Sequence, residues 1–121
     1  MIIEVRGKTF GIDLVNNYVT EKYSEMSSLA FDAIKLKHKM EDEKDTLTKA
    51  DIDEIGIQAD KIQKDVFFLR WDILQELLES NDITYDENWW KKRTSVEDVN
   101  DFILDCIKKD RTDKEGKSKK K

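Results

Sequence analysis

The side chains that most often act as bases or nucleophiles in enzymes are scarce in this sequence. His38 is the only histidine, it lies between Lys37 and Lys39, and no serine or cysteine nucleophile stands at a recognisable spacing from it. A catalytic triad with histidine as its base is therefore excluded. Cys106 is the only cysteine and lies on an apolar stripe, which favours a small buried side chain over a nucleophile. One cysteine also excludes an internal disulfide and a zinc site with several cysteine ligands.

Carboxylates are abundant, but their order does not indicate a metal site or an acid–base pair. Pairs such as Asp51 with Glu54, or Asp98 with Asp101, arise by chance in a chain with 27 acidic residues. The acidic segment 41–46 lacks the ligand order of a calcium loop, and no pair of histidines exists to bind zinc. The four glycines are never grouped into a phosphate-binding loop: they are Gly7, Gly11, Gly56 and Gly116. We therefore expect no metal, no cofactor and no enzymatic activity.

The charges are divided unevenly along the 121 residues, of which 40% are charged. Residues 110–121 hold six basic and three acidic side chains, whereas the rest of the chain holds 16 basic and 24 acidic ones, a net charge of −8. This acidic body argues against nucleic acid as a partner of the whole surface. The basic end can touch phosphates or an acidic protein, or it only keeps the chain in solution, and both alternatives stay open.

The sequence contains no signal for export or membrane insertion. The segment Met1–Arg6 lacks a basic region followed by an apolar one, so it does not indicate a signal peptide. The longest apolar run is Val66–Leu69, far below the roughly 20 residues that cross a bilayer. Together with the single cysteine, these features predict a soluble protein of a reducing cytoplasm.

Two short alternating segments begin the chain. Ile3 and Val5 fall on one side of an extended strand, and residues 9–12 are again compatible with a strand. Gly7 followed by Lys8 suits a two-residue turn of type II′, so the sequence predicts a β-hairpin over residues 2–13. A two-stranded ribbon is not stable by itself, and it must pack on the helices that follow.

Two long helices come next, and no proline interrupts them. A cap at Asn16 or Asn17 predicts the start of the first helix, and the acidic segment 41–46 predicts its end. Apolar or small residues recur on one face at helical spacing, with Lys37 at the missing step: Val19, Tyr23, Met26, Ala30, Ala33 and Met40. Three further apolar residues widen this stripe: Leu29, Ile34 and Leu36.

The second helix carries the strongest periodic signal. Thr48, with Asp51 three residues later, resembles an N-terminal capping arrangement, and the polar segment Ser80–Asp82 predicts the end of the helix. A heptad seam is sustained for about three repeats: Ile52, Ile55, Ala59, Ile62, Val66, Leu69 and Ile73. Beyond Val66, apolar residues also occur on the other faces. The C-terminal half of this helix is therefore expected at the centre of the fold.

Two further helices are predicted before the chain becomes polar. Asp86 caps a short helical turn, and Thr94 with Glu97 forms the capping box of a helix that extends to about residue 109. Residues 110–121 contain no apolar side chain and are expected to form a disordered, lysine-rich tail. The expected fold class is mainly α: a helical hairpin or small bundle in a single domain over residues 1–109, with the short N-terminal β-hairpin.

Large aromatic side chains exceed what a few small helices can easily enclose, so part of their surface is available to a partner protein. The candidate partner-binding residues are Phe67, Phe68, Trp71, Trp89 and Trp90. The alternative is that all five belong to the core. The heptad seam adds a second route to association, because the two long helices can pair with each other or the seams of two copies can meet.

Several features of the chain occur together in one known family. They are the hairpin Ile3–Phe10, two charged helices around an acidic connector, the aromatic segment Phe67–Trp71, a Trp-Trp pair before Ser95–Ile103, and a lysine-rich end. In size, in element order and in the placement of charged and aromatic segments, residues 1–121 resemble the small tail assembly chaperones of long-tailed bacteriophages that infect Gram-positive bacteria.

The resemblance implies a non-enzymatic protein of the bacterial host cytoplasm that binds the tape-measure protein, recruits tail-tube subunits and is absent from the finished virion. In that family a longer form is often made by ribosomal frameshifting, and Lys119–Lys121 would be encodable by an adenine-rich slippery run. The family has no catalytic residues to transfer. Apolar seams on a small helical protein with an acidic back could cover the apolar stripes of a long helical tape-measure chain.

Two other functions compete with this one. In the first, a small helical regulatory or nucleic-acid-associated protein touches phosphates through Lys91–Arg93 and the final lysines, although the acidic body would repel the same polyanion. In the second, a structural module uses its seam only to join copies of itself.

Overall fold

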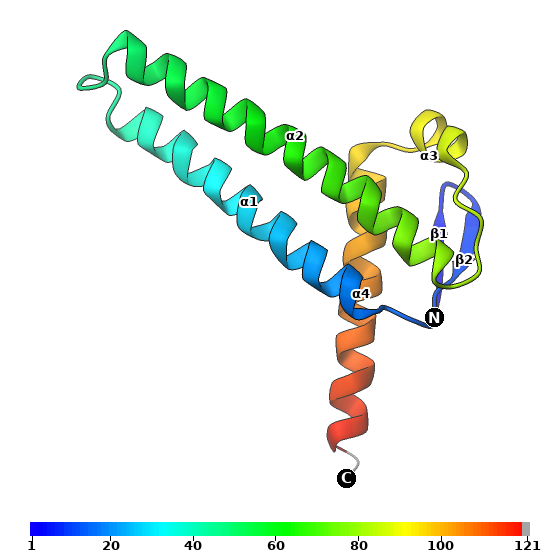
Figure 1. Cartoon of the computed structure of the whole chain (residues 1–121). Helices are drawn as coiled ribbons and strands as arrows, with labels where there is room; N and C mark the ends of the chain where they lie inside the picture. Colours follow the sequence, from blue (N-terminus) through cyan, green and yellow to red (C-terminus); the bar gives the residue numbers. More distant parts are fainter. Residues whose placement is uncertain (120–121) are drawn as a thin grey trace. The chain divides into compact units, whose positions relative to one another are not determined.

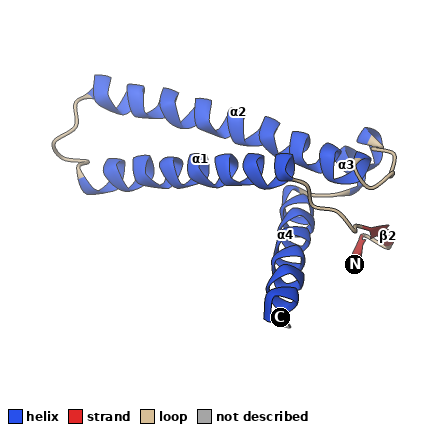
Figure 2. Ribbon diagram, turned by 60° about the horizontal axis from the view of Figure 1, so that its bottom comes forward, coloured by secondary structure: helices blue, strands red, loops and turns tan. Residues whose placement is uncertain are grey.

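The computed structural model describes the backbone of residues 1–119 and the side chains of residues 1–112. Its mainly helical class with an N-terminal two-stranded hairpin confirms the prediction from sequence (Figures 1 and 2). In chain order the elements are β1 (Ile2–Val5), β2 (Lys8–Gly11), α1 (Asn17–Asp42), α2 (Lys49–Glu79), α3 (Glu87–Arg93) and α4 (Val96–Lys119).

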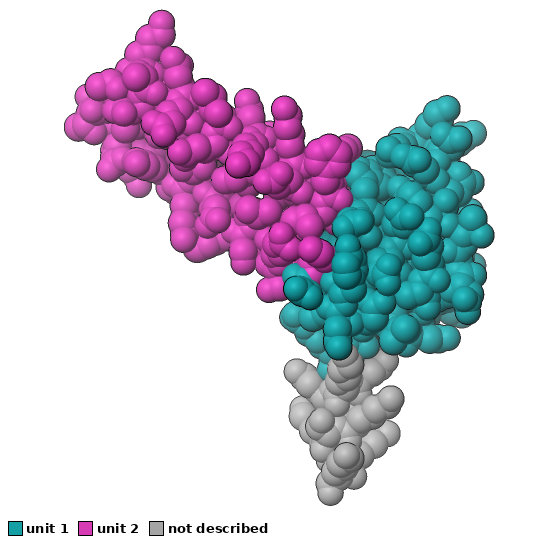
Figure 3. Space-filling view, viewed as in Figure 1, with its two compact units in different colours: residues 1–21, 71–121 teal, residues 22–70 magenta. Residues whose placement is uncertain are grey.

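The chain divides into two compact units (Figure 3). Unit 1 consists of residues 1–21 and 71–121, and unit 2 consists of residues 22–70. Both α1 and α2 contribute to each unit, because a boundary falls inside each helix. The sequence pattern, which predicts a single domain, does not indicate this division, since the heptad seam of α2 continues through residues 70 and 71 without a break.

The β-hairpin is built around a different turn from the predicted one. β1 and β2 are antiparallel, with Val5 opposite Lys8, so Arg6 and Gly7 form the two-residue loop. Their φ angles of 51° and 82° are both positive, as a type I′ turn requires. The predicted II′ turn at Gly7 and Lys8 is therefore wrong by one residue. The type I′ turn follows the right-handed twist of the strands, and the pairing buries Ile3, Val5 and Phe10 on one face.

The core of unit 1 joins the hairpin to three helices. Four rings, those of Phe10, Trp89, Trp90 and Phe102, form five contacting pairs with centroids 5.0–5.9 Å apart, and we call them the aromatic cluster. α2 adds fully buried side chains near its C-terminal end: Ile73, Leu74, Leu77 and Leu78. The predicted central role of the C-terminal half holds for these residues and is wrong for Phe67 and Phe68, which are exposed in unit 2. α4, which packs against β1, adds a further apolar row: Val99, Phe102, Ile103, Cys106 and Ile107.

Three helix starts form where the sequence predicts them. Asn16 caps α1, because its Oδ1 accepts a hydrogen bond from the Val19 amide at 3.0 Å. At α2, Thr48 Oγ1 accepts from the Asp51 amide and Asp51 Oδ2 accepts from the Thr48 amide, each at 3.1 Å. Asp86 caps α3 by accepting from the Trp89 amide. Each cap satisfies backbone N–H groups that the first turn of a helix leaves without partners.

The cap of α4 lies one residue later than the predicted pair Thr94 and Glu97. Ser95 Oγ accepts from the Asp98 amide at 3.2 Å, and Asp98 Oδ2 accepts from the Ser95 amide at 2.9 Å. Thr94 is used differently, since its hydroxyl donates to the carbonyl of Trp90 at the end of α3. Thr94 thus satisfies a carbonyl at the end of α3, and Ser95 is the residue that caps α4.

α4 extends beyond residue 109, where the sequence predicts that the helix ends. Thr112 Oγ1 donates to the carbonyl of Lys108 at 2.9 Å, four residues earlier in the same helix. Residues 110–112 therefore belong to α4, in keeping with the good helix propensity of arginine and the absence of proline. The rest of the predicted disordered tail, residues 113–121, lies outside the residues whose side chains are described.

Asn81 fastens the segment after β2 to the end of α2. Its Oδ1 accepts from the amides of Asp13 and Leu14, both at 2.9 Å. Its Nδ2 donates to the carbonyls of Leu14, at 2.9 Å, and Leu77, at 2.7 Å. The side-chain amide thus uses both acceptor positions and both donor hydrogens within unit 1.

We expect Asn81→Ala to lower the free energy of unfolding by about 2–3 kcal/mol, because it removes all four hydrogen bonds of this side chain. Urea denaturation followed by circular dichroism measures the change. Asn88→Ala, at an exposed position of α3, serves as the matched control and should change stability by less than about 0.5 kcal/mol. Equal stability of the Asn81→Ala variant and the parent would show that the hydrogen bonds of Asn81 do not stabilise the fold.

The Asp98 carboxylate also links α4 to the hairpin. The amide of Ser95 contributes most to lowering the pKa of Asp98 below its usual value of 3.8, and the Arg6 guanidinium, with Nε 2.7 Å from Oδ2, contributes next. A carboxyl whose pKa is lower in the folded state stabilises the fold above its unfolded pKa, and this stabilisation is lost as pH falls through the folded pKa.

Asp98→Asn should therefore have a lower melting temperature than the parent at pH 7, and the difference should shrink as the pH is reduced below about 4. Calorimetry of both proteins between pH 7 and pH 2.5 measures the difference. A gap that stays constant over this range would show that the charge of Asp98 does not stabilise the fold.

Candidate functional site

Unit 2 leaves most of its apolar side chains in contact with water. Of residues 22–70, all of which are described, only Met26 and Ile55 are buried apolar residues. Six large apolar side chains are exposed: Phe31, Ile34, Ile52, Ile57, Phe67 and Phe68. A pair of helices that exposes so much apolar surface is typical of a protein with a further packing partner.

Within unit 2, α1 and α2 run side by side in opposite directions along a seam (Figure 1). The α2 side of the seam agrees with the predicted heptad except at Ile52, which is exposed: Ile55 is buried, and Ala59, Ile62, Val66 and Leu69 are half-buried. On α1 the predicted stripe is wrong at Ala30 and Ile34, which are exposed. Lys37, at the predicted gap in the stripe, is exposed, and Leu29 and Leu36 of the widened stripe are half-buried. A leucine buries more apolar area than an alanine, which accounts for the burial of Leu29 rather than Ala30.

An apolar groove with a volume of about 350 Å³ lies between the two helices. Five of its lining residues come from α1 and three from α2: Ala33, Ile34, Leu36, Lys37, Met40, Ile55, Ala59 and Gln63. The small side chains of Ala33 and Ala59, one on each helix, let a third helix approach closely. Apolar side chains at heptad positions around them are suited to the stripe of an amphipathic helix.

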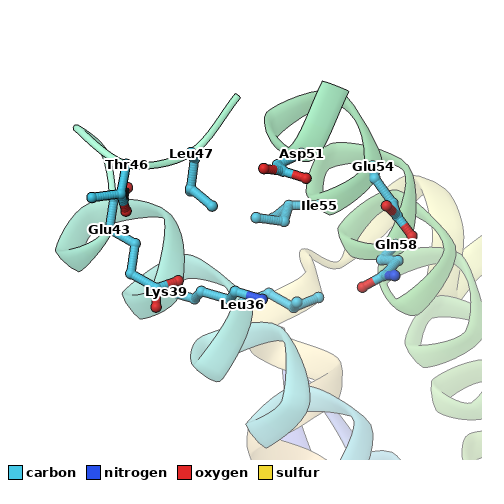
Figure 4. Close-up of a pocket in the computed structure, with 9 residues that line it drawn as sticks. All are labelled: Leu36, Lys39, Glu43, Thr46, Leu47, Asp51, Glu54, Ile55 and Gln58. Atoms are coloured by element: carbon cyan, nitrogen blue, oxygen red, sulfur yellow. Dashed lines mark hydrogen bonds between the residues drawn. The ribbon is translucent and has the colours of Figure 1, made fainter. Parts of the chain in front are cut away.

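A second hollow, of about 400 Å³, lies at the connection between the same helices and is lined by charged groups (Figure 4). Lys39 and Glu43 enter it from one side, and Asp51 and Glu54 from the other. The Thr48 amide, then the Thr48 hydroxyl, and less strongly the charge of Lys39, lower the pKa of Asp51. A general acid needs a raised pKa, so Asp51 is not suited to that role. Among the described residues, no three acidic, histidine or cysteine side chains are arranged to hold a metal ion.

The five predicted partner-binding residues fall into both units. Phe67 and Phe68 belong to unit 2, are 44% and 67% exposed, and have ring centroids 5.7 Å apart. Trp71, Trp89 and Trp90 belong to unit 1. Trp90 is only 1% exposed in the aromatic cluster, so its prediction as a surface contact is wrong: its ring packs against those of Phe10 and Phe102, with centroids 5.2 and 5.4 Å away.

Basic side chains lie over the other two tryptophan rings, which are half-buried. Lys8 Nζ lies 4.9 Å from the Trp89 ring centroid, and Lys91 Nζ lies 5.5 Å from that of Trp71. Lys91 also pairs with Glu87. The nucleic-acid interpretation assigns Lys91–Arg93 and the final lysines to phosphate, and of these residues Lys91 forms an ion pair within unit 1.

Sequence reasoning missed the groove as a binding site, although it assigned most of the lining residues to apolar stripes. The signal that indicates it is the combination of small residues, Ala33 and Ala59, with the exposed Ile34 beside them. Which residues face each other across two helices depends on the rotation of each helix about its axis, which spacing along the chain does not fix.

Cys106 is buried in unit 1, where the loss of water raises the pKa of its thiol to about 12. The thiol is therefore protonated at neutral pH, and a protonated thiol is a poor nucleophile. This burial agrees with the interpretation of Cys106 as a small core side chain.

No protein-family model, no curated protein and no solved structure matches this chain. The resemblance to tail assembly chaperones therefore rests on the residues and element order described above. Each helix in the described part of the chain is too short or too polar to cross a lipid bilayer.

We expect the Cys106 thiol to react with Ellman's reagent at pH 8 at least about 100 times more slowly in the native protein than in 6 M guanidinium chloride. Absorbance at 412 nm measures the rate. Ser27→Cys, which adds a thiol at an exposed position of α1, should show one fast and one slow thiol in the native state. Rapid labelling of the native parent would mean that Cys106 is accessible and ionised.

Proposed function

We propose that this chain is a non-enzymatic tail assembly chaperone of a long-tailed bacteriophage of a Gram-positive host. In this proposal it binds an amphipathic helix of the tape-measure protein in the apolar groove of unit 2. The groove is the observation that supports this function, because it presents an apolar seam that two helices do not cover. The resemblance of the chain to tail assembly chaperones supplies the class of partner.

The tape-measure protein needs such a groove because its own helices carry apolar stripes. A long helical chain with apolar stripes aggregates before the tail tube encloses it, unless another surface covers those stripes. Burying one leucine or isoleucine contributes about 1.5–3 kcal/mol, so a few such side chains seated between Ile34, Met40 and Ala59 offset the entropy lost on binding. The acidic, charged remainder of the surface keeps the complex in solution.

The proposal also includes the sequence of events around assembly. The chaperone acts in the host cytoplasm, recruits tail-tube subunits to the covered tape-measure protein, and leaves before the virion is complete. Phe67 and Phe68, exposed on α2, stay predicted contact residues for these partners. The function needs no reacting group, in keeping with the protonated Cys106 and the ionised Asp51.

Co-expression of the chain with the tape-measure protein encoded in the same genome tests the proposal. The parent chain should raise the soluble fraction of the tape-measure protein and co-purify with it. Ile34→Arg, at a groove residue that is 51% exposed, should reduce the soluble fraction at least about fivefold by placing a charge in the apolar groove.

Ile57→Arg is the matched control, because Ile57 is 70% exposed on α2 and does not line the groove. It should retain the activity of the parent. Circular dichroism of both variants confirms that helix content is unchanged. A tape-measure protein that is equally soluble with and without the chain would overturn the proposed function, and equal losses with both variants would overturn the assignment to the groove.

A further inference from the structure

The groove carries a charge opposite in sign to the chain as a whole. The chain has 27 acidic and 22 basic residues, yet none of the eight lining residues is acidic and the single charged one is Lys37. The adjoining part of α1, residues 34–40, contains three lysines and no carboxylate. On the facing wall, α2 contributes Ile55, Ala59 and the amide of Gln63.

Lys37 differs from the two neighbouring lysines in its surroundings. Lys35 Nζ lies 4.0 Å from an Asp32 carboxylate oxygen and 4.6 Å from the Phe31 ring centroid. Lys39 enters the charged hollow, where it lowers the pKa of Asp51. Lys37 is exposed at the groove and takes part in none of the ion pairs found among the described side chains. Its ammonium group is thus placed to meet a partner.

We infer that the helix bound in the groove carries acidic side chains beside its apolar stripe, so that a carboxylate faces Lys37. This inference rests on the proposed function and specifies the chemistry of its partner. A helix with lysines at those positions would place like charges together in a site from which it displaces water, and such a pair is repelled more strongly than in open solvent. Lys37 therefore selects against basic amphipathic helices as well as for acidic ones.

Two designed peptides serve as probes. Both have the same leucine and alanine seam over four heptads, and they carry either glutamate or lysine at every flanking position. Fluorescence anisotropy measures binding of each peptide to the full chain in 150 mM salt, where charges more than about 8 Å apart are largely screened. The quantity of interest is the ratio of the two affinities.

Lys37→Glu should change this ratio by at least about fivefold in favour of the lysine peptide. Lys61→Glu makes the same change in net charge at an exposed position of α2 that does not line the groove, and it should change the ratio by less than about twofold. Ile34→Arg should weaken the binding of both peptides if they occupy the groove. Raising the salt to 500 mM should reduce the effect of Lys37→Glu.

The outcomes separate the inference from the proposed function. Groove binding of both peptides with a ratio that Lys37→Glu leaves unchanged would overturn the acidic partner and leave the helix-binding function intact. Failure of both peptides to bind, together with a stable dimer in analytical ultracentrifugation that Ile34→Arg dissociates, would identify a second copy as the occupant. That result would overturn both the acidic partner helix and the proposed function.

Discussion

Exclusion of large apolar side chains from water is the interaction on which the rest of this structure depends. Among the described residues, every buried apolar side chain except Met26 and Ile55 belongs to unit 1. The hairpin, the end of α2, α3 and α4 all supply side chains to that core, so each covers the others. Unit 2 contains only parts of two helices and their connection, which bury one seam and leave their other faces in water.

This imbalance explains why the groove, rather than a reacting group, is the candidate site. Cys106 is enclosed in unit 1, and hydrogen bonds lower the pKa values of Asp51 and Asp98, which favours their ionised forms. The residues that line the apolar groove, in contrast, leave a hollow that no other part of unit 2 fills. The proposed binding of a partner helix would use this groove, and in that proposal Lys37 would add selectivity to it.

Local patterns in the sequence predicted the elements well, and spatial pairings less well. Caps at Asn16, Thr48 and Asp86 depend on bonds within one helical turn, so their residues reveal them. The turn at Arg6 and Gly7 depends on strand register, and the α1 seam depends on which side chains α2 presents. The burial of Trp90 and the groove beside Ala59 require the tertiary contacts themselves, which spacing along one chain does not contain.

The division of unit 1 into two distant stretches of sequence affects how the protein folds. Its core needs residues 1–21 to meet residues 71–121, and a bond from Tyr18 Oη to Asp72 Oδ2, at 2.8 Å, joins the two stretches. Closing so long a loop as a random coil costs entropy, whereas two antiparallel helices bring its ends together using contacts that are local in sequence. We expect folding of α1 against α2 to bring the two stretches of this core together, and a nascent chain on the ribosome to lack the complete core until α4 has emerged.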